Sequence, residues 1–187
     1  MRLDRLASGL EAALAAVSRT FAVIGGCAVL AMMLHVSADV LSKYLLNRPI
    51  VGTLEMVSHY YMVAAIFLPL AAIERARAHI IVELFTIRLG PRAILFLDAV
   101  ACLLAAVFAG VITWMAGIEA IRRTRSGEMI DAVYYQILVW PTRWLVPAGA
   151  LVFMLVLLLH ALRFMAAATA DEPPPPPRTM RDVEIDE

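Results

Sequence analysis

Four long runs of the chain contain no Asp, Glu, Lys or Arg. An α-helix rises about 1.5 Å per residue, so each run is roughly 27–30 Å long as a helix and matches a hydrocarbon core about 30 Å thick. The runs cover residues 20–38, 56–73, 99–118 and 144–162. The pattern therefore predicts four transmembrane helices. With their flanking residues these helices cover about 20–41, 54–74, 92–121 and 141–163.

Two segments outside these runs carry apolar residues at helical spacing among charged ones. Before the first run, the apolar positions are Leu3, Leu6, Leu10, Leu14 and Val17. Between the second and third runs they are Ile80, Ile81, Leu84, Phe85 and Leu89. Such stripes are typical of helices that lie in the membrane interface. A cleaved signal peptide at the N-terminus fits poorly, because the apolar run that follows Arg19 is longer than the roughly 7–15 apolar residues of a signal sequence.

The expected fold is thus an all-α integral membrane protein. It has an N-terminal amphipathic interfacial helix over residues 1–19, a four-helix membrane domain over 20–165, and a second interfacial helix between helices 2 and 3. Residues 166–187 include five consecutive prolines and end in acidic residues. That composition is typical of a disordered tail.

Composition narrows the class of function further. Hydrophobic residues make up 62% of the chain and charged ones 17%, against about 45–50% and 25% in soluble domains. The sixteen basic residues are balanced by sixteen acidic ones, which argues against nucleic-acid binding. Cys27 and Cys102 both lie in apolar runs, so we expect them to pack as small hydrophobes.

No Gly-rich phosphate loop, metal-ligand cluster or nucleophile–base arrangement is present in the sequence, so we expect no enzyme activity and no cofactor. The chain has four histidines that could be haem ligands: His35, His59, His79 and His160. No paired spacing within one helix supports haem binding. The third run instead carries Ala101, Ala105 and Ala109 every four residues, with Ala106 and Gly110 beside them. This is a small-residue face of the kind that packs membrane helices, and we expect it in the bundle core.

Sidedness follows from the basic residues. With the N-terminus in the cytoplasm, the inner segments hold ten Lys and Arg and the outer segments six. The positive-inside rule then favours both termini in the cytoplasm. All Trp and Tyr residues fall toward the outer side in this arrangement.

Polar side chains gather where the first two spans meet. His35, Asp39 and Lys43 follow i, i+4, i+8 spacing on the first helix, and Glu55 and His59 repeat the i, i+4 spacing on the second. One interpretation is a proton or cation site, because ionisable groups near a membrane interior are costly and often functional. The other is a set of interfacial charges that fix helix ends or bind a partner.

The order of these features resembles a known family. The residues that carry the resemblance are Asp39-Val40-Leu41-Ser42-Lys43-Tyr44, Asn47-Arg48-Pro49-Ile50, Thr53-Leu54-Glu55 and Glu74-Arg75-Ala76-Arg77-Ala78-His79-Ile80-Ile81-Val82-Glu83. Together, from about Ala22 to Leu162, they look like the small transmembrane subunit (Q-type, DctQ-like) of tripartite ATP-independent periplasmic (TRAP) transporters. Lys43 stands where the family more often has Arg, and Glu83 where Asp is common; both keep the charge.

The resemblance implies a three-part importer of organic acids in the bacterial inner membrane, driven by an ion gradient without ATP hydrolysis. Its partners are a large multi-helix permease subunit that carries the solute and ion sites, and a periplasmic solute-binding protein. The chain itself is then an accessory, scaffold-type subunit with no nucleic-acid partner. The alternative is a stand-alone ion-coupled carrier that uses His35, Asp39, Glu55 and His59.

Candidate residues follow from both lines of reasoning. Eight residues are candidates for fixing helix ends or contacting partner subunits: Asp39, Lys43, Arg48, Glu55, His59, Arg77, His79 and Glu83. Three more, in the third connection, are candidates for docking the binding protein: Arg122, Arg123 and Arg125.

Overall fold

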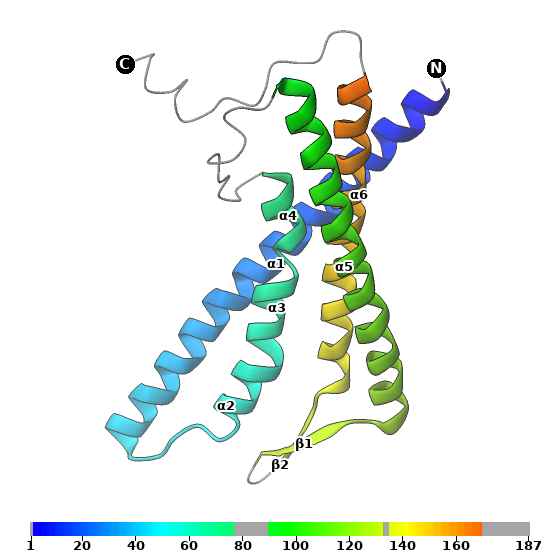
Figure 1. Cartoon of the computed structure of the whole chain (residues 1–187). Helices are drawn as coiled ribbons and strands as arrows, with labels where there is room; N and C mark the ends of the chain where they lie inside the picture. The colour runs from blue at the N-terminus through cyan, green and yellow to red at the C-terminus, as the bar shows by residue number, and fades with distance from the viewer. Residues whose placement is uncertain (1, 77–89, 133–134, 170–187) are drawn as a thin grey trace, which may run out of the picture.

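The computed structural model describes residues 2–76, 90–132 and 135–169. Within these ranges, four segments are long and apolar enough to cross a membrane: Gly9–Leu46, Thr53–Arg75, Arg92–Ser126 and Trp140–Thr169. The four predicted spans are confirmed as helical segments, and the structure extends them by a few residues at most ends. Successive spans run in opposite directions, so the N-terminal end of α1 and the C-terminal end of α6 lie at the same end of the molecule (Figure 1).

The first span belongs to one uninterrupted helix, α1 (Arg2–Leu46). The structure shows no separate helix over residues 1–19, so the expected boundary near residue 19 was wrong. Two hydroxyl groups at that point bond back to helix carbonyls, Ser18 to Ala15 and Thr20 to Ala16. They therefore continue the helix instead of capping a new one. At about 1.5 Å per residue, α1 is roughly 67 Å long, more than twice the thickness of a bilayer core.

The beginning of α1 also packs inside the bundle. Leu14 forms a buried cluster with Ala71, Val152 and Val156, and Ser18 is almost fully buried. Figure 1 shows α1 crossing behind the other helices at a steep angle. An apolar stripe that the sequence favoured for the lipid interface thus partly contacts protein.

The second span is broken into four short pieces, namely α2 (Thr53–Met56), the π-helix η1 (Val57–Tyr61), α3 (Met62–Phe67) and α4 (Leu70–Arg75). The break before α4 lies at Pro69, which has no N–H to donate and therefore interrupts the helix ladder. The wider π turn shifts the register of the side chains that follow it.

The third and fourth spans form a long antiparallel pair, α5 (Pro91–Ser126) and α6 (Leu145–Thr169). Pro91 occupies the first turn of α5, as predicted, and Gly127 ends the helix with a φ of 62°. Ala106 and Ala109 of α5 are buried against Leu157 of α6. The middle of the predicted small-residue face, with Ala105, Ala106 and Ala109, is therefore bundle core as expected, whereas Ala101 is exposed.

A short β-hairpin, absent from the predicted fold, joins these two helices. Its strands β1 (Met129–Ala132) and β2 (Tyr135–Leu138) pair antiparallel, with Ile130 opposite Ile137. A 3-10 turn, η3 (Trp140–Trp144), then leads into α6. Ile137 and Val139 pack against Met56 of α2 and Tyr60 of η1, so the hairpin covers the end of the second span.

Two glycines allow the broken span to approach its neighbours closely. A Cβ built on Gly25 of α1 would lie 2.7 Å from the Pro69 ring, and one on Gly149 of α6 would overlap the backbone carbonyl of Phe67. Both contacts are closer than a normal van der Waals contact. Glycine is therefore required where α1 and α6 enclose the second span.

The bundle has two polar ends. The hairpin end contains the α1–α2 turn (residues 47–52) and the β-hairpin (Figure 1). The opposite end contains the first turns of α1 and α5 and the last turns of α6, and α4 ends on that side of the molecule, short of those turns. The predicted interfacial helix between the second and third spans lies mostly within residues 77–89, outside the described residues.

Candidate functional site

At the hairpin end, side chains of α1 fix the turn that leads to the second span. Asp39 Oδ1 accepts a hydrogen bond from the Ile50 backbone N–H at 2.6 Å. The Ser42 hydroxyl donates to the Arg48 carbonyl, also at 2.6 Å, and Asn47 adopts a left-handed φ of 52°. A carboxylate that accepts a backbone N–H makes a stronger bond than a neutral group would. Asp39 therefore acts as a tie across the turn in this structure.

His35 lies one helical turn deeper and contacts the second span. Its Nδ1 is 3.3 Å from the Tyr61 hydroxyl and its Nε2 is 3.5 Å from Thr53 Oγ1. The two rings meet edge to face. Thr53 also donates to the Ile50 carbonyl at 3.0 Å, which joins this contact to the turn above it.

The other candidates on these two helices make fewer contacts. Lys43 and Arg48 are exposed, and Glu55 and His59 are half-buried in α2 and η1. Among the described residues, no hydrogen bond or ion pair joins His35 or Asp39 to Glu55 or His59. The four residues proposed as one cluster therefore lie toward the hairpin end of the first two spans, but they do not form one hydrogen-bonded network in the described part of the chain.

The π turn of η1 places two adjacent tyrosines on different partners. Tyr61 contacts His35 of α1, while the Tyr60 hydroxyl donates to the Leu138 carbonyl of β2. The sequence placed both only among the outer aromatic residues. Their roles in joining α1, the second span and the hairpin require the observed register of η1, which the amino-acid pattern did not reveal.

A charged cluster holds the hairpin against the ends of α5 and α6. Arg143 of η3 donates from Nε and Nη2 to the two carboxylate oxygens of Glu128, at 3.1 and 2.9 Å. Arg123 of α5 donates to Glu128 at 3.2 Å and to Glu119 at 2.6 Å. We call Glu119, Arg123, Glu128 and Arg143 the hairpin clamp. A two-point Arg–carboxylate pair fixes orientation as well as distance.

Glu128 is the most enclosed member of the clamp, with its side chain 13% exposed. The hydrogen bond from Arg143 is the main reason that the pKa of Glu128 lies below its ordinary value of 4.5; the charges of Arg143, Arg123 and His59 act in the same direction, and burial opposes them. Glu128 is therefore an anion at neutral pH and holds both arginines.

The three docking candidates differ in what they contact. Arg123 is engaged by the clamp, and Arg122 is 3.4 Å from Glu119 with its side chain 72% exposed. Arg125 is exposed and makes no hydrogen bond or ion pair in the part of the chain that the structure describes. The sequence treated these arginines as one run, whereas the structure gives each a different environment.

The opposite end carries a second polar group that the sequence did not single out. Glu74 of α4 and His160 of α6 are 3.2 Å apart, and their side chains are 11% and 12% exposed. Arg75 donates to the Ser18 hydroxyl at 3.2 Å, and Glu11 of α1 pairs with Arg163 of α6. These contacts join α1, α4 and α6. Of the predicted inner candidates, Arg77, His79 and Glu83 lie outside the described residues.

The polar groups described above make contacts within the subunit. Among the described residues, no set of three His, Cys, Asp or Glu side chains is placed to hold a metal ion. Every buried side-chain nitrogen or oxygen in that part of the chain has a hydrogen-bond partner. The polar side chains thus join helices at both ends of the bundle, and the contacts between those ends involve glycine, alanine and aliphatic residues.

Comparison with known proteins identifies the family. Residues 32–167 match the model of the DctQ component of tripartite ATP-independent periplasmic transporters. No curated protein and no solved structure matches the chain. The DctQ family is a non-enzymatic transporter component, and it implies a TRAP complex with a DctM subunit and a periplasmic binding protein. Because the match covers well over half of the sequence, the chain belongs to this family and is a multi-pass DctQ small subunit of a TRAP transporter.

Proposed function

We propose that the chain is a scaffold for the large DctM subunit during ion-gradient-driven, binding-protein-dependent uptake of an organic acid. The observation that carries this proposal is the placement of the ionisable contacts. Glu11, Glu74 and the hairpin clamp are all engaged with other side chains of this subunit at the ends of the bundle. A secondary carrier usually places its binding groups near the midplane of the membrane, often at broken helices.

The broken second span offers a direct contrast with a carrier. Its interruption at Pro69 is filled by close packing of Gly25 and Gly149 from the neighbouring helices. Carriers instead use such breaks to present backbone groups to a solute or ion. This packing favours the scaffold role for the subunit, with the solute and ion sites in DctM.

We further propose that both termini are cytoplasmic, which places the hairpin end in the periplasm. The excess of Lys and Arg in the inner segments supports this orientation. Lys43, Arg48 and Arg122 are exposed there and are suited to docking the binding protein. Arg123 contributes indirectly by holding the hairpin.

Reconstituted vesicles test the scaffold role. Uptake of the organic acid that the cognate binding protein captures is measured with DctQ alone, with DctM and binding protein, and with all three proteins under an imposed ion gradient. We expect uptake from the complete set and none from DctQ alone. Uptake by DctQ alone that follows the gradient would establish the carrier alternative.

The same assay tests docking through charge reversal. The double variant Lys43→Glu, Arg48→Glu should require about tenfold more binding protein for half-maximal uptake, because charged rims mainly set association rates. Arg19→Glu is the matched control, since Arg19 is exposed near the other end of α1. An unchanged requirement for binding protein, with the membrane complex intact, would remove this docking surface from the proposal.

A further inference from the structure

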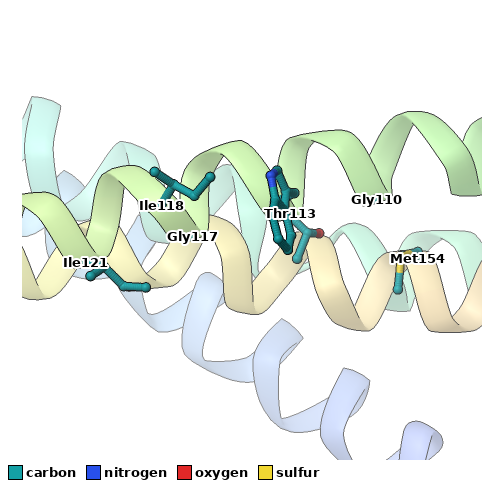
Figure 2. A pocket seen from close by; sticks show the side chains of 7 residues that line it. Gly110, Thr113, Gly117, Ile118, Ile121 and Met154 are labelled. Atoms are coloured by element: carbon teal, nitrogen blue, oxygen red, sulfur yellow. The ribbon is translucent and has the colours of Figure 1, made fainter.

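An open apolar groove runs along α5 near the hairpin end. Its walls are Gly110, Thr113, Trp114, Gly117, Ile118 and Ile121 of α5, with Met154 of α6. Figure 2 shows Ile121 and Met154 toward opposite ends of this groove. The Thr113 hydroxyl donates to the Ala109 carbonyl, so the walls offer a ligand almost no free polar group.

Gly110 and Gly117 leave space in the groove, and at Gly117 no other part of the described chain requires a glycine. A Cβ on Gly117 would meet nothing within 4 Å, and one on Gly110 would meet only Met154 at 3.3 Å. Glycine costs a helix interior about 1 kcal/mol relative to alanine. At Gly25 and Gly149 the close approach of the second span accounts for the glycine, whereas at Gly117 the space stays open to the membrane.

The dimensions of the groove fit one extended chain. From Gly110 to Ile121 a helix rises about 16 Å, close to half of a bilayer core about 30 Å thick. The groove has a volume of about 380 Å³. Spread over that length, its mean cross-section is about 23 Å², less than a third of that of a helix about 10 Å wide.

A free cation lies at one end of the same face. Gly110, Trp114, Gly117 and Ile121 follow the i, i+4, i+7, i+11 spacing of one helix stripe. One turn further on, Thr124 and Arg125 flank the line of that stripe on its two sides, and Arg125 is the i+4 neighbour of Ile121. Arg125 is exposed and has no ion-pair partner among the described residues. Its neighbours Arg122 and Arg123 are both engaged by Glu119.

The level of Arg125 along the helix corresponds to a membrane–water boundary. Trp144, on the η3 turn, donates from its indole nitrogen to the hydroxyl of Thr124 at 3.0 Å, the residue before Arg125. Tryptophan is enriched at the headgroup level of membranes. A phosphate at that level would meet a guanidinium suited to two-point binding of phosphate oxygens.

We propose that this groove binds one acyl chain of an anionic phospholipid, whose headgroup phosphate is bound by Arg125. The apolar walls bind the acyl chain, and the charge complementarity between Arg125 and the phosphate fixes the position of the headgroup. An anionic lipid is preferred because its headgroup carries no ammonium group that offsets the phosphate charge. The bound lipid covers a face of α5 that the subunit leaves open. The proposal concerns lipid and does not depend on the transport role of the subunit.

Quenching of Trp114 fluorescence by brominated lipid tests the proposal. The full chain, with Trp140→Phe and Trp144→Phe so that Trp114 is its only tryptophan, is placed in phosphatidylcholine vesicles. Either brominated phosphatidylglycerol or brominated phosphatidylcholine is added at increasing fractions. We expect the anionic lipid to quench at about fivefold lower fraction, the preference that one arginine near a charged lipid surface provides.

Three variants separate the groove from a general attraction to charge. Arg125→Gln should abolish the preference for the anionic lipid, and Lys43→Gln, which removes another exposed cation at the hairpin end, should leave it unchanged. Gly117→Leu fills the groove while keeping Arg125, and it should also abolish the preference. Equal quenching by both lipids in the parent protein, or a preference that survives either Arg125→Gln or Gly117→Leu, would overturn the proposal.

The complex with DctM provides a second measurement. If the lipid occupies the groove, Trp114 in the purified DctQ–DctM complex keeps its preferential quenching by brominated phosphatidylglycerol. If that quenching disappears when the two subunits assemble, a helix of DctM occupies the groove, and the lipid assignment is wrong.

Discussion

The two helix pairs of this subunit are held together in different ways. The α5–α6 pair is continuous and packs through Ala106, Ala109 and Leu157. The second span is interrupted and meets its neighbours through two glycine contacts and polar bonds at its ends. Burial differs in the same direction: 22% and 39% of the most apolar parts of the third and fourth spans are buried, against 6% and 17% in the first and second spans.

Continuous and interrupted membrane helices depend on different kinds of contact with their neighbours. Water does not drive helices together inside a bilayer, so continuous helices associate through close packing of small side chains. A span broken by proline loses part of its own hydrogen-bond ladder and gains stability from neighbours on both sides. Long exposed faces on α1 and α5 remain, which suits a subunit that works within a larger complex.

The largest loss of stability that this contrast predicts is at Gly149. Gly149→Val places a branched side chain against the Phe67 carbonyl, a backbone atom that cannot move aside as a side chain would. We expect a loss of about 3 kcal/mol in the free energy of unfolding, at the upper range for overpacking. Denaturation of the purified subunit in mixed detergent measures it.

Gly117→Val is the matched control for this substitution. It introduces the same side chain into a membrane helix at a position where a Cβ meets nothing within 4 Å. We expect its unfolding free energy to stay within about 0.5 kcal/mol of the parent protein, as for substitutions away from packed features. Equal losses at both positions would mean that glycine contacts do not distinguish the broken span.

The sequence revealed the spans well because their signal is local. Uncharged runs located all four helical segments, and Pro91 marked the start of α5 correctly. The N-terminal boundary failed because the apolar stripe of residues 1–19 looks the same whether it meets lipid or protein. Burial of Leu14 against α4 and α6 depends on how the helices cross, which spacing along one helix does not encode.

The polar contacts were harder to predict because their partners are distant in the chain. His160 was weighed as a haem ligand, and its partner Glu74 lies 86 positions away. The hairpin has strands of only four residues each and relies on Glu128, Arg143 and Tyr60 for attachment. A run of adjacent arginines likewise gave no sign that Arg123 alone belongs to the clamp.

A smaller loss of stability is expected when the contact between Glu74 and His160 is removed at the opposite end of the bundle. Glu74→Leu and His160→Leu each remove one side of the contact between α4 and α6. A double-mutant cycle on detergent denaturation should give a coupling free energy of about 1 kcal/mol, within the range measured for polar contacts between membrane helices. Glu74→Gln should retain most of the stability, because an amide can still bond to the imidazole. A coupling near zero would show that packing alone holds the broken span.

The smallest effect concerns the hairpin clamp, where the second span meets the α5–α6 pair. The pKa of Glu128 in the folded protein lies below its ordinary value of 4.5, so the stabilisation that its charge provides is fully present above pH 4.5 and is lost as the pH falls through the lowered pKa. We expect hydrogen exchange of the Ile130 and Ile137 amides, corrected for intrinsic rates, to be constant from pH 7 to 5. It should accelerate below pH 4.5 while the amides in the middle of α5 remain protected.

In Glu128→Gln the hairpin should exchange faster at neutral pH and lose this dependence on pH. A parent protein whose hairpin stays equally protected under acid conditions would mean that apolar packing of Ile137 and Val139 on η1 suffices, and that this joint resembles the α5–α6 pair.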